Sequence, residues 1–200
     1  MDLQDKILKV KAFSFDVDGV LTDGSLFSTP EGDLIRVFHS HDGFAMRNAI
    51  LNGYRLSIIT GGESDSIVMR YRDMGIAGPD MRQRARNKLP EFYDWCAFRG
   101  LDPSEVAYFG DDVPDIAVLK SCGLAVCPSD AVDEVKEVCD IVTKAPGGRG
   151  CVREALERIM RAQGTWIFNP EAHDRAYNGS MSNKEPVLRR GPSGPRCSPP

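Results

Sequence analysis

The chain has 200 residues, of which 42% are hydrophobic, so it is long enough and apolar enough to bury the core of one compact domain. Lysine and arginine (25) against aspartate and glutamate (29) give a net charge of −4, without the basic clustering that would indicate a nucleic-acid binder. No apolar run approaches the ~18 residues of a membrane span, and residues 1–10 lack a basic start followed by an apolar segment, so we expect a soluble, cytoplasmic protein with no membrane partner.

Apolar runs typical of strands alternate with segments of helical periodicity from residue 10 to about residue 163. In chain order, we expect strand 10–16, helix 43–52, strand 54–60, helices 64–75 and 89–100, strand 105–112, helix 113–122, strand 123–128, helix 131–138, strand 140–143 and a last helix around 152–160. This alternation predicts an α/β fold in which a doubly wound, mostly parallel sheet of Rossmann-like type is covered by helices on both faces.

One insertion breaks the alternation. Two short β-prone runs within residues 24–39 flank Thr29-Pro30-Glu31-Gly32-Asp33, whose turn-forming residues predict a β-hairpin at the mouth of the sheet. We expect a core domain over 1–164 and a C-terminal extension over 165–177. Residues 178–200 are rich in Pro, Gly and Ser and have little to bury, so we expect a disordered tail there.

The residues that follow the predicted strands form the candidate site. In an open parallel sheet, ligands bind outside the carboxyl ends of the strands, so side chains at these positions converge. Acids follow the first and third strands, a hydroxyl and a glycine follow the second, and a lysine begins the helix before the third. These residues are Asp16 and Asp18, Thr60 and Gly61, Lys88, and Asp111 and Asp112.

The crowding of acids at this edge indicates a bound cation. Carboxylates gathered in one water-poor cleft repel each other and raise each other's pKa values unless a positive charge lies among them. Taken singly, Asp18-Gly19 is a common turn and Asp111-Asp112 a common helix cap. Together, after neighbouring strands, they favour a magnesium site, because Mg²⁺ prefers hard oxygen ligands and is held by one or two carboxylates plus a substrate phosphate.

Four segments in order, "DVDGVLTDG", "IITGG", Lys88 and "GDDVPD", resemble the motifs of the haloacid dehalogenase superfamily of aspartyl-phosphate phosphatases. The hairpin in place of a cap domain, "FHSHDG" and "GGRG" followed by "VRE" are similar to the 3-deoxy-D-manno-octulosonate 8-phosphate (KDO 8-phosphate) phosphatases of that superfamily. The resemblance implies a magnesium-dependent phosphomonoesterase that hydrolyses KDO 8-phosphate, a small sugar phosphate, in lipopolysaccharide precursor synthesis.

The resemblance also implies a catalytic role for each matched residue. Asp16 would attack phosphorus and form an aspartyl-phosphate, while Asp18 would protonate the leaving sugar oxygen and then activate water. Thr60, beside Gly61, would hydrogen-bond a phosphoryl oxygen. Lys88 would neutralise the nucleophile and the developing phosphoryl charge.

Further residues take metal-binding and substrate-binding roles by the same resemblance. The metal would be bound by Asp16, the backbone carbonyl of Asp18 and Asp111, with Asp112 and Asp115 supporting these ligands, and Arg70 and Arg149 would contact the substrate. One departure concerns Lys88: the preceding "MRQRARNK" is polar and basic, where the family commonly has a short apolar strand and a glycine. Another is His39, at a position where the resemblance predicts asparagine.

Three alternatives remain open. A related branch of phosphatases acts on nine-carbon keto acid 9-phosphates such as deaminoneuraminate, but Gly62 lacks the acidic side chain associated with that branch. A phosphoacceptor receiver domain also clusters Asp, Thr and Lys on a doubly wound sheet, although receivers place the acid pair, rather than a D-x-D motif, after the first strand. The third alternative is a scaffold without catalysis that oligomerises through its hairpin.

The hairpin carries more apolar side chains than a solvated flap should. A single hairpin is marginal in water and has unpaired edges, so we expect it to pair with other copies. We therefore predict a homotetramer whose hairpins and "GTWIF" segments cover neighbouring sites. The apolar residues concerned are Leu26, Phe27, Leu34, Ile35, Val37 and Phe38.

Overall fold

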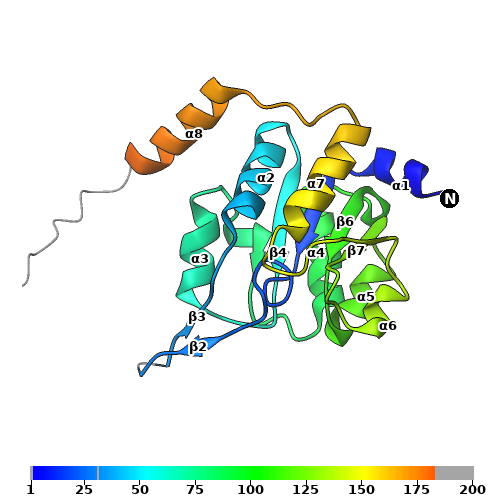
Figure 1. Cartoon of the computed structure of the whole chain (residues 1–200), viewed down its shortest axis with the longest axis horizontal. Helices are drawn as coiled ribbons and strands as arrows, with labels where there is room; N and C mark the ends of the chain where they lie inside the picture. The colour runs from blue at the N-terminus through cyan, green and yellow to red at the C-terminus, as the bar shows by residue number, and fades with distance from the viewer. Residues whose placement is uncertain (1, 31, 183–200) are drawn as a thin grey trace, which may run out of the picture.

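The computed structural model describes residues 2–30 and 32–182 and shows strands alternating with helices along the chain (Figure 1). The elements in chain order are α1 (Leu3–Lys9), β1 (Ala12–Phe15), β2 (Phe27–Ser28), β3 (Leu34–Ile35), α2 (Ser40–Leu51), β4 (Arg55–Ile59), α3 (Asp65–Arg72), η1 (Gly78–Asp80), β5 (Met81–Arg82), α4 (Lys88–Arg99), η2 (Pro103–Glu105), β6 (Val106–Phe109), η3 (Val113–Asp115), α5 (Ile116–Leu119), β7 (Leu124–Cys127), α6 (Asp133–Lys136), β8 (Ile141–Val142), α7 (Cys151–Ala162) and α8 (Pro170–Ser182).

Six strands form one sheet in the order β5-β4-β1-β6-β7-β8, and every pairing is parallel. The chain leaves β1 for β4 and β5 on one side, and then returns to β6, β7 and β8 on the other. The strand order therefore reverses between β1 and β6, which is the position where open α/β sheets bind their ligands. The predicted doubly wound parallel sheet is confirmed.

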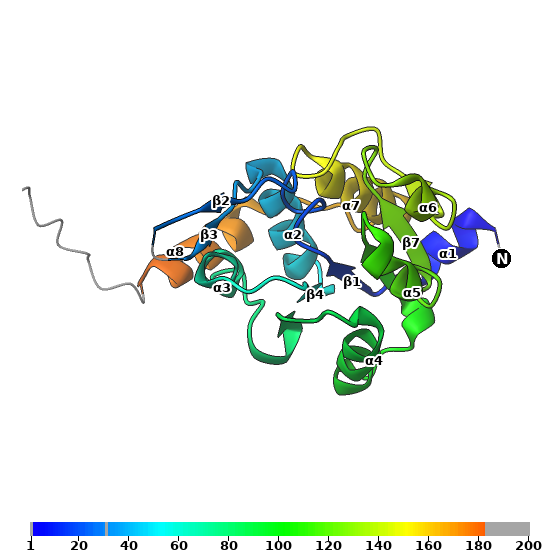
Figure 2. The ribbon, with the colours of Figure 1, turned by 90° about the horizontal axis from the view of Figure 1, so that it is seen from below.

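Two layers of helices cover the sheet because its side chains alternate between the faces. Phe13 and Phe15 of β1 pack with apolar residues of α1, α2, α3 and α7, whereas Ala12 packs with those of α4, α5 and α6. Figure 2 shows α2 and α7 on one side of β1 and β4, and α4 on the other. All four residues of β1 are buried, as are those of β6 and β7, so the strand that leads into the first acids lies in the enclosed centre of the sheet.

Helix α1 and strand β5 are among the elements that the sequence did not predict. Helix α1 is short, and β5 lies within the polar segment before Lys88. Strand β5 pairs with the end of β4, where Ile58 faces Met81 and Ile59 faces Arg82. Backbone hydrogen bonds continue past the strands, from Thr60 N to Arg82 O at 2.9 Å and from Ala85 N to Thr60 O at 2.9 Å. These bonds, rather than apolar side chains, fix the path of the chain toward Lys88.

The predicted hairpin is present and extends from the body of the molecule beyond α3 (Figure 1). Strands β2 and β3 pair antiparallel, with Phe27 opposite Ile35. Thr29 N donates to Asp33 O at 2.9 Å and closes the turn. The described residues thus contain an inserted hairpin and no cap domain.

Helix α8 includes the first residues of the tail that the sequence predicted to be disordered. Its residues 178–182 are helical, and residues 183–200 of the predicted tail lie outside the described residues. The ring of His173 stacks on Phe44 of α2 with centroids 5.1 Å apart, and its Nε2 lies 3.1 Å from Asn48 Oδ1. These contacts anchor α8 on α2, which composition alone could not indicate. Among the described residues, no helix combines the length and apolar character needed to cross a membrane.

The start of α7 supports the loop that follows β1. Asp42 of α2 is buried and accepts hydrogen bonds from Arg153 N at 2.7 Å and Gly150 N at 3.1 Å, so it caps α7 from a neighbouring helix. A Cβ at Gly147 would lie 1.8 Å from the backbone oxygen of Gly19, so the glycine permits direct backbone contact with that loop. The segments "FHSHDG" and "GGRG" thus act together to hold the loop after β1.

We expect Asp42→Ala to lower the free energy of unfolding by about 1–3 kcal/mol, because two partly buried N–H groups would lose their buried acceptor. Denaturant unfolding followed by circular dichroism measures this loss. Asp65→Ala, at an exposed position in the first turn of α3, is the control and should change stability by less than ~0.5 kcal/mol. Equal effects of the two substitutions would contradict the assigned support.

Candidate active site

A cavity of about 370 Å³ opens at the carboxyl edge of the sheet. The ends of β1, β4 and β6 and the first residue of α4 contribute to its wall, as parallel strand topology requires. Its lining residues are Asp16, Asp18, Thr60, Gly61, Gly62, Ala85, Arg86, Lys88, Asp111, Asp112, Pro114 and Asp115. The structure therefore brings together all the residues predicted for catalysis and for the metal.

Asp16 and Lys88 form a buried ion pair at the base of the cavity. Lys88 Nζ lies 3.1 Å from Asp16 Oδ1, and both residues are about 5–6% exposed. Burial raises the pKa of Asp16 to about 7, against the opposing charge of Lys88. Burial alone would lower the pKa of Lys88, but Asp16 and Asp115 outweigh it and raise that pKa. Lys88 therefore remains an ammonium that favours the ionised form of Asp16.

Asp115 holds this lysine in place. Its Oδ1 accepts from Lys88 Nζ at 2.7 Å and from the Tyr108 hydroxyl at 2.6 Å, and its side chain is fully buried. Its Oδ2 accepts weaker bonds from the backbone N–H groups of Asp111 and Asp112 at 3.3 and 3.4 Å. Both oxygens therefore already have donors, which fits a residue that holds its neighbours in place; its supporting role in the site stays a prediction.

Asp111 has a buried carboxylate oxygen, Oδ1, to which none of the described residues donates a hydrogen bond. Burial, together with the charges of Asp16 and Asp115, raises the pKa of Asp111 to about 8. Carboxylate oxygens of Asp16, Asp111 and Asp115 lie within 4.8 Å of one another. An unpartnered buried carboxylate in such a group fits a cation bound between Asp111 and Asp16.

A glycine makes room for Asp111. A Cβ on Gly19 would lie 1.9 Å from Asp111 Oδ2, and Gly19 also has a φ of +92°. The glycine of the Asp18-Gly19 pair is therefore required by its backbone conformation and by the close approach of β6 to the loop after β1.

Thr60 and Gly61 form the opposite wall. Thr60 is buried, and its hydroxyl accepts a hydrogen bond from Gly62 N at 3.2 Å, which shapes the turn after β4. The hydroxyl proton remains available for donation to a ligand in the cavity. Asp112 is more exposed and caps η3 through a bond from Val113 N at 2.7 Å.

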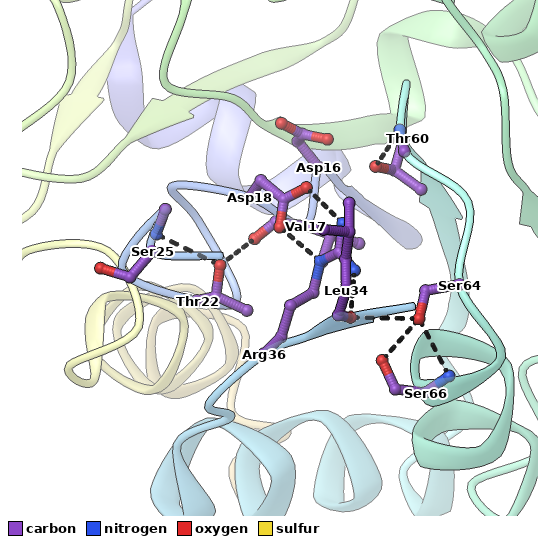
Figure 3. A network of polar contacts seen from close by, with 12 residues as sticks. Asp16, Val17, Asp18, Thr22, Ser25, Leu34, Arg36, Thr60, Ser64 and Ser66 are labelled. Atoms are coloured by element: carbon purple, nitrogen blue, oxygen red, sulfur yellow. Dashed lines mark hydrogen bonds and ion pairs between the residues drawn. The ribbon is translucent and has the colours of Figure 1, made fainter. Parts of the chain in front are cut away.

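Asp18 is held by an arginine that the sequence analysis did not single out. Arg36, directly after β3, donates from Nε to Asp18 Oδ1 at 2.6 Å and from Nη2 to Asp18 Oδ2 at 2.9 Å (Figure 3). The Asp18 side chain is 27% exposed, whereas that of Arg36 is fully enclosed. The hairpin thus reaches one of the acids of the site through a two-point contact.

The two arginines predicted to bind substrate do not line this cavity. Arg149 Nη2 pairs with Asp23 Oδ2 at 2.9 Å on the outer side of the loop after β1. Arg70 lies over the ring of Phe38 at 6.0 Å and borders a separate cavity between α2, α3 and α8. Their contact with substrate stays a prediction.

Two basic residues are additions to the predicted set. Arg86 lines the cavity from the segment before α4. The sequence gives no signal for Arg36, because alternation predicts that its apolar neighbours Ile35 and Val37 face inward, whereas in the structure they are 48% and 59% exposed. In a half-buried strand, an arginine whose immediate neighbours are exposed points inward, and it then requires an anion.

Comparison with known proteins identifies a family for the chain. A family model described as haloacid dehalogenase-like hydrolase matches residues 80–153, which include Lys88 and the acids after β6. The KDO 8-phosphate phosphatase KdsC of Escherichia coli strain B is 34% identical over 163 residues, which cover 82% of this chain and 86% of that protein.

Solved structures give the same result. The KDO 8-phosphate phosphatase of Moraxella catarrhalis, in complex with magnesium ion, phosphate ion and KDO, is 30% identical with a TM-score of 0.78 and covers 87% of this chain and 97% of its own. The enzyme of Yersinia pestis is 31% identical with a TM-score of 0.79, over 82% and 88% of the two chains. This chain therefore belongs to the haloacid dehalogenase-like hydrolases, in the family of the KDO 8-phosphate phosphatases KdsC.

Proposed function

We propose that this protein is a magnesium-dependent phosphomonoesterase that hydrolyses KDO 8-phosphate to KDO and phosphate through an aspartyl-phosphate on Asp16. The observation that carries the proposal is the pairing of a buried carboxylate, Asp16, with a buried ammonium, Lys88, beside the unpartnered Asp111. Burying such charges costs desolvation free energy on folding, and the same charges can stabilise a phosphoryl group as it is transferred.

In the first step, a carboxylate oxygen of Asp16 attacks phosphorus and the bond from phosphorus to the sugar oxygen breaks. Asp18 lines the same cavity and donates a proton to the leaving oxygen. Lys88 Nζ and the Thr60 hydroxyl offer positive charge and a hydrogen bond to the phosphoryl oxygens, where negative charge develops. The products of this step are the free sugar and the aspartyl-phosphate.

In the second step, a water molecule attacks phosphorus, and Asp18, now a carboxylate, accepts its proton. The bond between Asp16 and phosphorus breaks, which releases phosphate and restores the carboxylate. Lys88 then stabilises the leaving carboxylate, so its fixed position next to Asp16 serves both steps.

The donor set fits a magnesium ion. Asp16 and Asp111, with the backbone carbonyl of Asp18, would hold Mg²⁺, and Asp115 would keep Lys88 and the Asp111 backbone in place. The bound ion would supply positive charge to the phosphoryl oxygens and to the crowded acids. The related Moraxella catarrhalis structure holds magnesium, phosphate and KDO together, which supports this proposal.

The eight-carbon sugar is the proposed substrate because the Escherichia coli and Yersinia pestis relatives are KDO 8-phosphate phosphatases and because Gly62 adds no side chain to the cavity. A nine-carbon keto acid 9-phosphate is the second candidate. Phosphate release from a panel of sugar phosphates that includes both substrates tests the choice: the proposal requires the highest kcat/KM for KDO 8-phosphate.

We expect Asp16→Asn to abolish turnover while the melting temperature stays equal to or above that of the wild type. An amide cannot attack phosphorus, and the substitution removes one of the crowded negative charges. Phosphate release and thermal unfolding measure the two effects. Asp133→Asn, at a side chain that is 95% exposed on α6, is the control and should keep full activity. Activity of Asp16→Asn above a few percent would exclude Asp16 as the nucleophile.

We expect the stability of the metal-free protein to fall as pH rises from about 4 to about 8. The folded-state pKa values of Asp16 and Asp111 are about 7 and about 8, above the ordinary 3.8, so the folded chain binds protons that the unfolded chain has released in this interval. Mg²⁺ should remove most of this decline, because it compensates the ionised acids.

Thermal unfolding across this pH range, with chelator or with Mg²⁺, measures the dependence. The Asp111→Asn variant is the matched control and should show a shallower decline in chelator. Phosphate release should vanish in chelator and be inhibited by Ca²⁺, whose larger and more flexible shell misplaces the nucleophile. Full activity in excess chelator would refute the metal assignment.

We also propose a homotetramer formed through the hairpins. Phe27 and Ile35 face each other across the hairpin and are 60% and 48% exposed, with Val37 at 59%. A two-stranded sheet with this much exposed apolar surface is stabilised by association with further copies. The neighbour's hairpin would then cover the open cavity and exclude water from the reaction.

Phe27→Asp and Ile35→Asp should therefore yield smaller species that keep the fold and hydrolyse 4-nitrophenyl phosphate but lose activity toward KDO 8-phosphate. Light scattering and circular dichroism measure assembly and fold. Leu8→Asp, at another exposed apolar position on α1, is the control and should leave the assembly unchanged. A fully active monomer, either wild type or variant, would contradict the proposal.

A further inference from the structure

Arg36 is the most enclosed charged residue of the hairpin, and it points toward the cavity rather than to solvent. Its side chain has no exposed surface, although Ile35 and Val37 on either side are about half exposed. Besides the two bonds to Asp18, its Nη1 donates to Leu34 O at 3.0 Å. In the part of the chain that the structure describes, Asp18 is the only carboxylate that pairs with it.

Asp18 in turn has no other donor. The bonds from Arg36 are the only hydrogen bonds that the described residues make to the Asp18 carboxylate, in contrast to Asp115, which has four donors. A planar guanidinium that binds both oxygens fixes the plane of the carboxylate as well as its distance. The remaining lone pairs of Asp18 are left free to face the cavity.

Gly62 leaves space for the contact between Arg36 and Asp18, and the start of α3 holds the strand that precedes Arg36. A Cβ on Gly62 would lie 2.9 Å from Arg36 Nη2 and 3.4 Å from Asp18 Oδ2, so a side chain at position 62 would displace the arginine. The Ser64 hydroxyl donates to Asp33 Oδ1 at 2.9 Å. It also approaches Leu34 O at 3.3 Å, which ties β3 to the start of α3 (Figure 3). The base of the hairpin is thus fixed next to the cavity.

We propose that Arg36 is a positioning residue that aims the carboxyl of Asp18 at the leaving oxygen, so that the hairpin sets the orientation of the acid. The inference rests on the proposed phosphatase function. An aspartate side chain rotates about two bonds, and proton transfer requires a heavy-atom distance of about 2.6–3.2 Å to the leaving oxygen. Without the two-point contact, Asp18 would occupy this geometry for a smaller fraction of the time.

The test uses two aryl esters whose leaving groups differ in how much they need an acid. Phenyl phosphate has a poor leaving group and 4-nitrophenyl phosphate a good one, and neither has a sugar for the hairpin to contact. The kcat/KM for each ester reports on formation of the phosphoenzyme. We expect Arg36→Met to lower kcat/KM for phenyl phosphate at least about tenfold more than for 4-nitrophenyl phosphate, because general acid catalysis contributes about 10²–10⁴ in rate.

The same loss should depend on Asp18. In an Asp18→Asn background, Arg36→Met should cause no further change in the ratio of the two kcat/KM values, because the residue acts through that carboxyl. Arg36→Lys keeps the buried positive charge and protects the fold, but an ammonium cannot bind both carboxylate oxygens as a guanidinium does. It should therefore also lower kcat/KM more for phenyl phosphate than for 4-nitrophenyl phosphate, by a smaller factor than Arg36→Met. Arg72→Met, at an exposed position at the end of α3, is the control and should change neither ester.

The positioning role would be overturned if Arg36→Lys and Arg36→Met lowered kcat/KM equally for both esters or lowered it for neither. It would also be overturned if Arg36→Met changed the ratio of the two kcat/KM values further in the Asp18→Asn background. None of these outcomes affects the proposed phosphatase function, which fails instead if the wild type releases no phosphate or if Asp16→Asn remains active.

Discussion

The site depends on one buried ammonium placed among carboxylates. Lys88 lies within 3.1 Å of Asp16 and 2.7 Å of Asp115, in a region that has almost no contact with water. Without it, the acids at the ends of β1 and β6 would repel each other at short range in a medium of low dielectric constant. Of the two acids that Lys88 contacts, Asp16 is the one with an oxygen left for a ligand in the cavity, because both oxygens of Asp115 already accept hydrogen bonds.

The negative charge that Lys88 leaves uncompensated determines what the site can bind. Asp111 has a buried oxygen without a partner, and the pKa values of Asp16 and Asp111 are raised to about 7 and about 8. A group of this kind favours binding of a divalent cation and a phosphoryl group, which together complete the charge balance. The fold holds the arrangement by close backbone approaches at Gly19 and Gly147 and by the capping of α7 through Asp42.

Sequence reasoning predicted the parts of the structure that have a strong local or topological signal. The apolar runs of β1, β4 and β6 identified the sheet, and the rule that ligands bind at the carboxyl edge then brought Asp16, Thr60 and Asp111 together. The turn residues at 29–33 likewise identified the hairpin.

The missed features depend on long-range contacts instead. Strand β5 contains only two residues, and it is defined by backbone bonds to β4 rather than by its composition. Helix α8 forms where Phe44 and Asn48 of a distant helix contact His173. The pairing of Arg36 with Asp18 joins residues on different elements, and the exposure of residues 35–37 is the inverse of what their apolar and polar alternation predicts.

The central claim is that phosphate is transferred to Asp16, and the most direct measurement is chemical trapping of that acyl phosphate. Borohydride reduces an aspartyl-phosphate to homoserine, which peptide mass spectrometry can assign to a single residue. Reaction with substrate and Mg²⁺ followed by rapid quenching and reduction should place homoserine at position 16, most abundantly in Asp18→Asn, which cannot activate water. Continued turnover with no modification at position 16, or with modification at another acid, would contradict the account.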